Sequence, residues 1–490
     1  MPLNLESRLP LAFVTVVSFC TAFGRDIALA ASLGLGVESD YIWVALLLPT
    51  VFENLLGVAV RDTVISNGVR GSQSTWSGRL AVGLLGAFAL LCIPMALFAE
   101  HMVRLIAPSW PQAVMSSDAV RAFQVASLLI PLHFAHYFLA GIGAVQNRFF
   151  MGQTRSIALN IGMTFTAIAV PGAVIAVLVG VVVAAAMHAI TFYVQLSPVV
   201  PGMMAGTADE RTGQVSWTNG FIALFVVALC QQLIVVAERA FASSLEMGSV
   251  TVLSMAFRIA TIPVALGVGS FVVAYLVSLK DASKESQVAM SWHLRELIDV
   301  TAWFILPICL VMSALSTPAL ELMFMRGRFS FGDVQSLAEV LNSYLIGVPF
   351  LAVGMIISRA LIVTNRGSRL MGISVISLVF YFAAATLMKE DLSRAVLGIL
   401  YSAAMVIQCV LLFFFLYIES DDESKRVWRA WRKSHCYIAA TVVSAIFLYL
   451  VDDLVLRVLF MVFLLSPVCC YGVWSELKDS KSRVARDAGG

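Results

Sequence analysis

Charged residues are scarce in this sequence. Only 13% of its 490 residues are Asp, Glu, Lys or Arg, whereas 60% are hydrophobic and the mean hydropathy is +0.90. A soluble chain carries about 25% charged and about 45–50% apolar residues. With half that charge, too few polar groups remain to cover a surface in water. This excludes a soluble enzyme, a nucleic-acid-binding protein and a disordered chain, and it predicts an all-α polytopic membrane protein.

The residue patterns that mark a metal site or a catalytic centre are also absent. The eight cysteines lie almost all within apolar runs, without the paired spacing of a disulfide framework or a zinc site. The longest predicted outer loop, about residues 100–120, holds no convergent set of acid and base residues. We therefore expect no catalytic residue, no metal and no cofactor. The net charge of +2 indicates no polyanionic partner such as nucleic acid.

Fourteen apolar runs approach the length of about 20 residues that a membrane-crossing helix needs. They cover residues 9–35, 41–65, 80–99, 121–145, 156–172, 175–197, 217–245, 249–278, 297–316, 335–363, 369–388, 394–418, 435–451 and 454–474. With the N-terminus in the cytoplasm, the inner segments carry 20 of the 32 basic residues, Arg155 among them, and the outer segments carry 7. The positive-inside rule therefore predicts that both termini are cytoplasmic.

The sequence also contains an internal duplication. Four residues recur 214 positions later, namely Arg25, Ala28, Gly34 and Pro49 as Arg239, Ala242, Gly248 and Pro263. Three more recur 218 positions later, namely Pro131, Asn147 and Arg148 as Pro349, Asn365 and Arg366. The displacement covers six spans, an even number, so both copies have the same orientation. Parallel repeats of this kind are typical of transporters.

The duplication predicts two parallel six-helix lobes followed by two extra C-terminal helices. The predicted parts are an N-terminal lobe over 1–200, a C-terminal lobe over 215–418, a basic cytoplasmic linker over 419–434, spans 13 and 14 over 435–475, and a cytoplasmic tail over 476–490. The basic run of the linker, with Trp428 and Trp431, is typical of an interfacial helix on an anionic leaflet. It is equally typical of charges that only set the topology.

Six ionisable residues lie at membrane depth in spans 1, 2, 7 and 8. They are Arg25, Asp26, Glu53, Glu238, Arg239 and Arg258. Counted from the outer ends of their spans at 1.5 Å per residue, Arg25, Glu53 and Arg258 lie roughly 14–18 Å deep, close to the middle of the hydrocarbon. Charges at this depth usually face an aqueous cavity or pair with one another. The six residues therefore predict a polar cavity or, alternatively, buried ion pairs that hold helices together.

Two histidines, His133 and His136, lie one helical turn apart in span 4. This spacing suits a metal site or a proton relay. Because no third ligand lies near them in the sequence, a hydrogen-bonded pair in the protein core is the favoured interpretation.

Short motifs follow one another in a fixed order between about residues 10 and 380. They are Phe23-Gly24-Arg25-Asp26, Ser39-Asp40, Leu48-Pro49, Gln146-Asn147-Arg148-Phe149, Asn160, Phe241-Ala242-Ser243, Gly248-Ser249, Arg258 with Pro263 and Gly267, Met325-Arg326-Gly327-Arg328-Phe329, Gly347-Val348-Pro349 and Ser358-Arg359-Ala360. In order and spacing they resemble the MurJ/MviN family of lipid II flippases, which belongs to the multidrug/oligosaccharidyl-lipid/polysaccharide exporter superfamily.

This resemblance implies a flippase that moves an undecaprenyl-pyrophosphate-linked saccharide across the bacterial cytoplasmic membrane by alternating access. It implies a central cavity for the headgroup, with substrate contacts at Arg25, Asp26, Asp40 and Arg258. It also implies that spans 13 and 14 form a groove for the lipid tail. We expect the membrane potential or an ion gradient to drive transport. The expected partners are the lipid-linked saccharide, membrane lipids, and a glycan polymerase or other proteins of a synthesis complex.

One position departs from the family pattern. Where the family has a further cavity arginine in span 2, this chain has Glu53, and Val58-Ala59 replace the acidic-glycine segment that follows it. A pyrophosphate needs net positive charge, whereas the charges of the cluster sum to about zero. Either the headgroup differs, as in a flippase of exopolysaccharide or O-antigen repeat units, or Arg61 further along the same helix face supplies the charge. We favour the first interpretation.

Glu53 and Glu238 are the candidate coupling groups, because a carboxyl at membrane depth can exchange a proton during a transport cycle. Together with Glu53, Arg61 and Arg239 are further candidates for contact with the substrate. A cation-coupled small-molecule antiporter of the MATE type would share the two lobes but normally have twelve spans. A membrane-embedded glycan polymerase or ligase would normally carry a large outer loop with catalytic residues. A non-transporting member of the same family also agrees with the loss of cavity charge.

Overall fold

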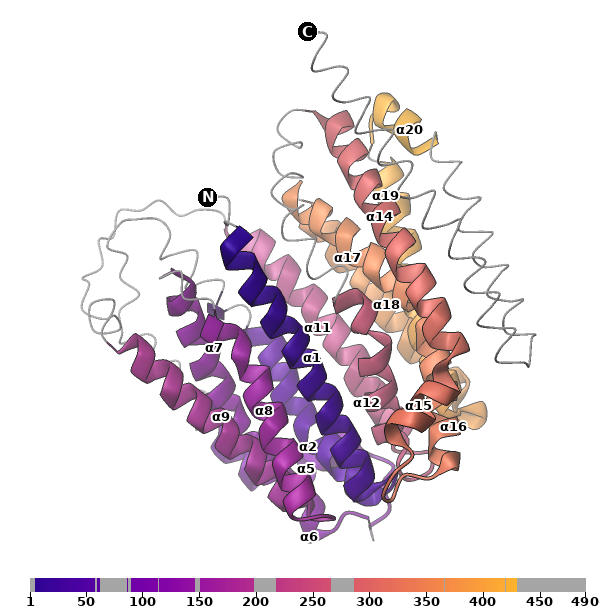
Figure 1. The fold of residues 1–490 in the computed structure, drawn as a ribbon. Helices are drawn as coiled ribbons and strands as arrows, with labels where there is room; N and C mark the ends of the chain where they lie inside the picture. Colours follow the sequence, from indigo (N-terminus) through magenta and orange to yellow (C-terminus); the bar gives the residue numbers. More distant parts are fainter. Residues whose placement is uncertain are drawn as a thin grey trace. The chain divides into compact units, whose positions relative to one another are not determined.

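The computed structural model of the chain is built of helices. It describes residues 5–57, 60–61, 86, 90–112, 114–145, 150–197, 217–265, 286–364, 366–418 and 420–429, and no strand occurs among them. The first elements in Figure 1 are α1 (Leu5–Leu33), α2 (Val37–Phe52), η1 (Glu53–Gly57), α5 (Ala99–Ile106), α6 (Ser117–Ser127), α7 (Leu129–Val145), α8 (Phe150–Ala169), α9 (Val174–Leu196), α11 (Trp217–Ala242) and α12 (Ser249–Ala260). They are followed by α14 (Gln287–Ala314), α15 (Ser316–Phe324), α16 (Phe331–Leu345), α17 (Val348–Val363), α18 (Gly367–Leu387), η2 (Lys389–Asp391), α19 (Arg394–Ile418) and α20 (Asp422–Arg429).

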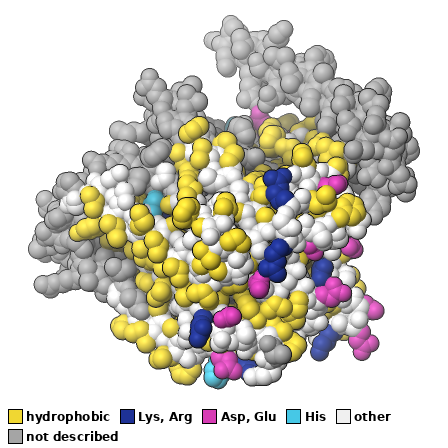
Figure 2. Space-filling model, turned by 60° about the horizontal axis from the view of Figure 1, so that its bottom comes forward, with side chains coloured by type: hydrophobic (Ala, Val, Ile, Leu, Met, Phe, Trp, Pro, Cys, Tyr) yellow, Lys and Arg dark blue, Asp and Glu magenta, His cyan; other side chains and the backbone are white. Residues whose placement is uncertain are grey.

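Eight helices among the described residues are long and apolar enough to cross a membrane. Figure 2 shows hydrophobic side chains over much of one face, with charged groups gathered from its centre toward the lower right. Large exposed apolar side chains such as Phe165, Ile190 and Leu387 are favourable against lipid and unfavourable against water. The predicted class, an all-α polytopic membrane protein, is confirmed. The count of fourteen spans stays a prediction, because the last two lie outside the described residues.

The chain forms two compact units whose segments alternate along the sequence. Unit 1 comprises Met1–Met255, Leu320–Leu337 and Leu378–Leu397, and unit 2 comprises Ala256–Ala319, Ala338–Ser377 and Gly398–Gly490. One boundary falls inside α12. This division by contact is not the division into an N-terminal and a C-terminal lobe, so the two six-helix lobes stay a prediction.

In unit 1 the helices α8 and α9 pack closely along each other. The spans predicted over 156–172 and 175–197 correspond to these helices, and they meet at Gly172, whose φ of 81° strongly favours glycine. A Cβ atom added to Gly162 would lie 2.7 Å from the carbonyl oxygen of Gly180, and one added to Gly180 would lie 2.9 Å from that of Gly162. Glycine at both positions therefore lets the two backbones touch, as small residues do between membrane helices.

Two of the predicted spans are broken. The span predicted over 121–145 is divided between α6 and α7 at Leu128. The span predicted over 335–363 is divided between α16 and α17, just before Pro349. Proline is favoured in the first turn of a helix because the missing N–H has no intrahelical partner there. The apolar runs thus predict the position of the membrane segment but not its interruptions.

Span 2 changes its helix type in the middle. The α-helix α2 contains Pro49 and ends at Phe52, and the chain continues as the π-helix η1. Single π-turns of this kind occur frequently at functional sites. A Cβ atom on Gly57, the last residue of η1, would lie 2.4 Å from the ring of Tyr137 on α7. Glycine therefore lets the π-turn lie directly against α7.

The two copies of the duplication share a backbone turn. Gly34 follows α1 and Gly248 precedes α12, and their φ angles are 67° and 88°. A Cβ atom on Gly34 would lie 3.0 Å from the carbonyl oxygen of Arg328, and one on Gly248 would lie 3.1 Å from the carbonyl carbon of Leu35. Both positions require glycine for its conformation and for its size.

In unit 2, α14 packs against α17 and α20. Phe257, Tyr344 and Tyr401 form a cluster of edge-to-face rings whose centroids lie 5.2–5.6 Å apart. The hydroxyl of Ser402 accepts a hydrogen bond from the backbone N–H of Gly347 over 3.0 Å and donates one to the carbonyl oxygen of Ser343 over 2.6 Å. Ser402 thereby satisfies backbone groups at the break between α16 and α17.

Candidate substrate-binding site

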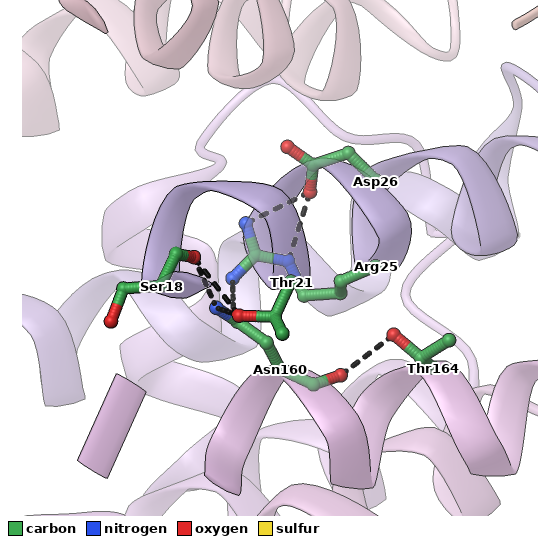
Figure 3. Close-up of polar contacts among 6 residues, drawn as sticks. All are labelled: Ser18, Thr21, Arg25, Asp26, Asn160 and Thr164. Atoms are coloured by element: carbon green, nitrogen blue, oxygen red, sulfur yellow. Dashed lines mark hydrogen bonds and ion pairs between the residues drawn. The ribbon is translucent and has the colours of Figure 1, made fainter. Parts of the chain in front are cut away.

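Arg25 lies at the centre of a polar network between α1 and α8 (Figure 3). Its Nε donates to Asp26 Oδ1 over 2.9 Å, and its Nη2 lies 2.8 Å from the same oxygen. Its Nη1 donates to Asn160 Oδ1 over 2.8 Å. The amide nitrogen of Asn160 donates in turn to Thr21 Oγ1 over 3.3 Å and to the carbonyl oxygen of Ser18 over 3.4 Å. An acid and an amide therefore fix the orientation of the guanidinium.

The fixed guanidinium retains donors for an anion. An arginine has five N–H groups, and the contacts with Asp26 and Asn160 use three of them among the described residues. The side chain is 14% exposed, and the ring of Trp43 lies 5.8 Å from its central carbon. The remaining two donors suit the oxygens of a phosphate group, which guanidinium binds in a bidentate way.

A small recess lies beside Asp26 in unit 1, with room for about one water molecule. Its lining includes Trp43, Ser39 and Thr251 as well as apolar side chains of α1 and α2. Sites for small molecules usually have about 300–1,000 Å³. This recess alone is therefore too small for a saccharide headgroup in the conformation described.

Glu53 is the centre of the second polar cluster of unit 1. Nη1 of Arg155 donates to Glu53 Oε1, and Nη2 of Arg155 donates to Glu53 Oε2 over 3.1 Å. The hydroxyl of Tyr137 donates to Oε1 over 3.0 Å, and Nδ1 of His133 lies 3.2 Å from Oε2. Groups from α7 and α8 thus surround the carboxylate, and its closest partner is a bidentate arginine.

Arg155 is only 9% exposed and lies in α8, which begins at Phe150, before the predicted span. Its assignment to the inner side of the membrane stays a prediction. Adding Arg155 to the six predicted charges gives seven, with one net positive charge. Hydropathy did not reveal this residue, because the polar neighbours Gln153, Thr154 and Ser156 place the start of the apolar run after it.

Three histidines lie near the Glu53 cluster. The ring centroids of His136 and His188 are 5.3 Å apart, and Nε2 of His188 lies 3.2 Å from Thr154 Oγ1. His133, His136 and His188 are all buried. No group of His, Cys, Asp or Glu side chains in the described part of the chain has an arrangement that suits a metal ion. His188, from α9, is a member of this cluster that the sequence spacing did not indicate.

Asp40 binds the N-terminus of α12. Its Oδ2 accepts from the backbone N–H of Gly248 over 2.8 Å. Its Oδ1 accepts from the backbone N–H of Thr251 over 2.8 Å and from the Thr251 hydroxyl over 2.6 Å. Asp40 is 1% exposed, so its carboxylate acts as a helix cap in this conformation. Its predicted contact with substrate has no counterpart in this geometry and stays a prediction.

The remaining predicted site residues lie in α11, in α12 and after η1. Nη1 of Arg239 lies 2.9 Å from Oε2 of Glu238, and their side chains are 5% and 1% exposed. This is the buried ion pair that the sequence left open as an alternative. Arg258 lies in the last turn of α12 and belongs to unit 2, and Arg61 is half-buried in unit 1. Contact of Arg239, Arg258 and Arg61 with a headgroup stays a prediction, and so does the coupling role of Glu238.

Comparisons with known sequences identify relatives over most of the chain. A family model described as "Lipid II flippase MurJ" matches residues 29–468. A probable lipid II flippase MurJ from Aquifex aeolicus (strain VF5) is 22% identical over 368 residues, which cover 71% of this chain and 70% of that protein. Another from Thermotoga maritima is 22% identical over 365 residues, which cover 73% of this chain and 74% of that protein.

Solved structures with the same fold come from two kinds of transporter. A lipid II flippase MurJ in an inward closed conformation has a TM-score of 0.76 at 17% identity, over 95% of this chain and 99% of that one. An inward-facing multidrug resistance MATE family transporter has a TM-score of 0.63 at 13% identity, over 84% of this chain and 97% of that one. At such identities the likeness shows the fold alone.

Proposed function

Because this chain belongs to the MurJ lipid II flippase family, we propose that it moves an undecaprenyl-pyrophosphate-linked saccharide from the inner to the outer leaflet of the bacterial cytoplasmic membrane. Its family makes it a transporter of a lipid-linked precursor rather than an enzyme, since the family model covers residues 29–468. The MATE alternative has only the shared fold in its favour. The polymerase or ligase alternative has no structural observation in its favour.

The geometry of Arg25 is the observation that supports this function best. A flippase must carry a polar headgroup through about 30 Å of hydrocarbon without exposing it to lipid. Asp26 and Asn160 hold the Arg25 guanidinium in one orientation, with two N–H donors left for phosphate oxygens. Asp26 also compensates the charge of Arg25 while the site is empty. An incoming pyrophosphate then replaces part of this compensation instead of meeting a bare buried cation.

Transport by alternating access is part of the same proposal. A headgroup of saccharide size does not fit the recess beside Asp26. We propose that the headgroup binds in a conformation in which the lobes open toward one side of the membrane. We propose that Arg258 contributes a second guanidinium in that conformation.

We propose lipid II itself as the cargo. The argument for a different headgroup assumes that the negative charge of Glu53 cancels part of the positive charge of the site. In the structure Arg155 binds this carboxylate in a bidentate way, so Glu53 does not neutralise Arg25. The net charge of the cluster is then compatible with a pyrophosphate.

Further features of the transport cycle follow from the same proposal. The termini lie in the cytoplasm, and spans 13 and 14 hold the lipid tail. The membrane potential or an ion gradient drives transport. Membrane lipids and a glycan polymerase or other synthesis proteins are the partners, because the flipped precursor must be consumed at the outer face by a glycosyl-transfer reaction.

Rescue of a bacterial strain depleted of its lipid II flippase tests the proposed function. We expect the unaltered chain to restore growth and to restore lipid II at the outer leaflet, measured by its accessibility to an impermeant probe. Arg25→Ala should abolish the rescue at an unchanged amount of protein in the membrane. Arg25→Lys should rescue only in part, because an ammonium keeps the charge but lacks the bidentate fork.

Arg104→Ala is the matched control. Arg104 forms an exposed pair with Glu100 on α5, and its loss should leave the rescue unchanged. Full rescue by Arg25→Ala would show that Arg25 is not needed to bind the headgroup. If the unaltered chain fails in this strain but restores surface polysaccharide in a strain lacking an O-antigen or exopolysaccharide flippase, the cargo is that repeat unit and not lipid II.

A further inference from the structure

The cluster around Glu53 has no part in the proposed headgroup contacts. Arg155 and Glu53 form a bidentate pair, so the two charges cancel. Tyr137 donates its hydroxyl to the same carboxylate over 3.0 Å. The remaining partner, His133, presents Nδ1 at 3.2 Å from Glu53 Oε2 and is 4% exposed. A titratable imidazole therefore lies in contact with a carboxylate that an arginine already binds.

Other polar and charged groups lie on the elements packed against this contact. On α7, His136 adjoins Tyr137, and its ring lies 5.3 Å from that of His188 on α9. Arg61 also acts on Tyr137 by its charge. From α11, Gln232 accepts a hydrogen bond from Asn54 over 3.4 Å, an uncharged contact. The other candidate coupling acid, Glu238, is held by Arg239 beside it in the chain.

A proton on His133 would change the partners of Glu53. A neutral imidazole adds no charge to the Glu53–Arg155 pair. An imidazolium adds one positive charge and an N–H donor 3.2 Å from Oε2, the oxygen that also accepts from Nη2 of Arg155. The imidazolium and the guanidinium then compete for one oxygen, and their like charges repel each other. The bidentate pair is thereby weakened.

Competition between His133 and Arg155 for Glu53 would weaken the contacts that hold the π-turn η1 against α8. Glu53 is its first residue and contacts α8 through Arg155 and α7 through Tyr137. Gly57, its last residue, lies against the Tyr137 ring. Pro49 lies just before the turn and already weakens the continuity of the helix. Span 2 is thus held by one carboxylate at the place where it bends most easily.

We propose that Glu53 and His133 form a proton-binding site, and that a bound proton loosens Arg155 from Glu53 and frees η1 to move. The site is distinct from the headgroup contacts at Arg25, and the proposal does not depend on the identity of the cargo. In this proposal, proton binding controls the movement of span 2. The coupling role predicted for Glu53 alone then belongs to Glu53 and His133 together.

Hydrogen–deuterium exchange of the full-length protein in detergent tests the proposal. Peptides that cover residues 50–57 are compared at pH 4 and pH 7.5, with labelling times scaled for the pH dependence of the chemical step, because burial and the charge of Arg155 oppose protonation of His133. We expect exchange at the lower pH to be faster by about tenfold, the change that the loss of one charged hydrogen bond produces. His133→Gln should abolish this pH dependence. Glu53→Gln should give fast exchange at both pH values.

His101→Gln is the matched control, because His101 is an exposed histidine on α5. It should keep the pH dependence of the unaltered protein. Each variant is first checked by size-exclusion chromatography, and the pH comparison within the unaltered protein needs no variant. Equal exchange at both pH values in the unaltered protein would overturn the proposal. So would pH dependence that persists in folded His133→Gln.

Discussion

At the scale of single residues, the charges predicted at membrane depth in unit 1 occur in pairs. Arg25 contacts Asp26, Glu53 contacts Arg155, and Glu238 contacts Arg239. Burying an unpaired charge is very unfavourable, and a partner with well-placed hydrogen bonds offsets much of that penalty. Arg25 and Arg239 each pair with a residue adjacent to it in the chain. The partner of Glu53 is 102 residues away.

Asp40 is the residue for which the geometry makes the sharpest prediction about stability. Asp40→Ala removes three hydrogen bonds and leaves the backbone N–H groups of Gly248 and Thr251 without that acceptor. We expect a loss of about 1–3 kcal/mol in stability, the range for unsatisfied buried donors. The measurement is the unfolding midpoint of the purified protein in detergent, followed by intrinsic fluorescence.

Asp391→Ala provides the comparison, since Asp391 is an exposed acid in η2. Its loss should change stability by less than about 0.5 kcal/mol. If both variants unfold at the same temperature as the unaltered protein, the contact between α2 and α12 does not stabilise the fold.

At the scale of helices, close packing in unit 1 depends on small residues. Helices in lipid gain little from the hydrophobic effect against one another, so close contact between their backbones contributes more. Gly162 and Gly180 permit this contact between α8 and α9. α8 also supplies Arg155 and Asn160. The packing of this one helix therefore positions the partners of both Glu53 and Arg25.

Gly180→Ala should separate α8 from α9. The added methyl group would lie 2.5 Å from the Thr166 side chain and 2.9 Å from the carbonyl oxygen of Gly162. We expect a destabilisation of about 1–3 kcal/mol, as for other overpacked interiors, measured as a lower unfolding midpoint in detergent. A Cβ at Gly372 in α18 meets no atom within 4 Å. Gly372→Ala should therefore leave the midpoint unchanged or raise it slightly; equal effects of the two changes would contradict the proposed contact.

At the scale of the whole molecule, the orientation in the membrane rests on the distribution of basic residues alone. Of the 32 basic residues in the chain, 20 lie on the predicted inner side and 7 on the outer side. This asymmetry predicts cytoplasmic termini.

The two ends of α19 allow this orientation to be measured. α19 has 25 residues and is about 37 Å long, enough to place its ends on opposite sides of the membrane. Glu390 in η2 precedes it and Asp421 follows it, and both are exposed. We expect an impermeant maleimide to label Glu390→Cys but not Asp421→Cys in intact cells, above the labelling of the parent chain. The opposite pattern would place both termini outside.

The class of the protein and two of its ion pairs are predictable from the sequence. Composition and apolar runs are local properties, so they suffice to predict membrane helices and to separate α8 from α9. The Arg25–Asp26 and Glu238–Arg239 pairs are predictable because their partners are adjacent in the chain. The positions of helix breaks at Leu128 and of the π-turn were not, because packing against other helices stabilises them.

The contacts between groups far apart in the sequence depend on the tertiary structure. Asn160 lies 135 residues from Arg25, and Thr251 lies 211 residues from Asp40. Glu53 contacts a basic residue that hydropathy assigned to the cytoplasm. The partner of a buried charge depends on which helix packs beside it, and a local sequence pattern does not predict that packing. The scarcity of charge thus predicted the membrane, whereas helix packing determined what each of the few charges does there.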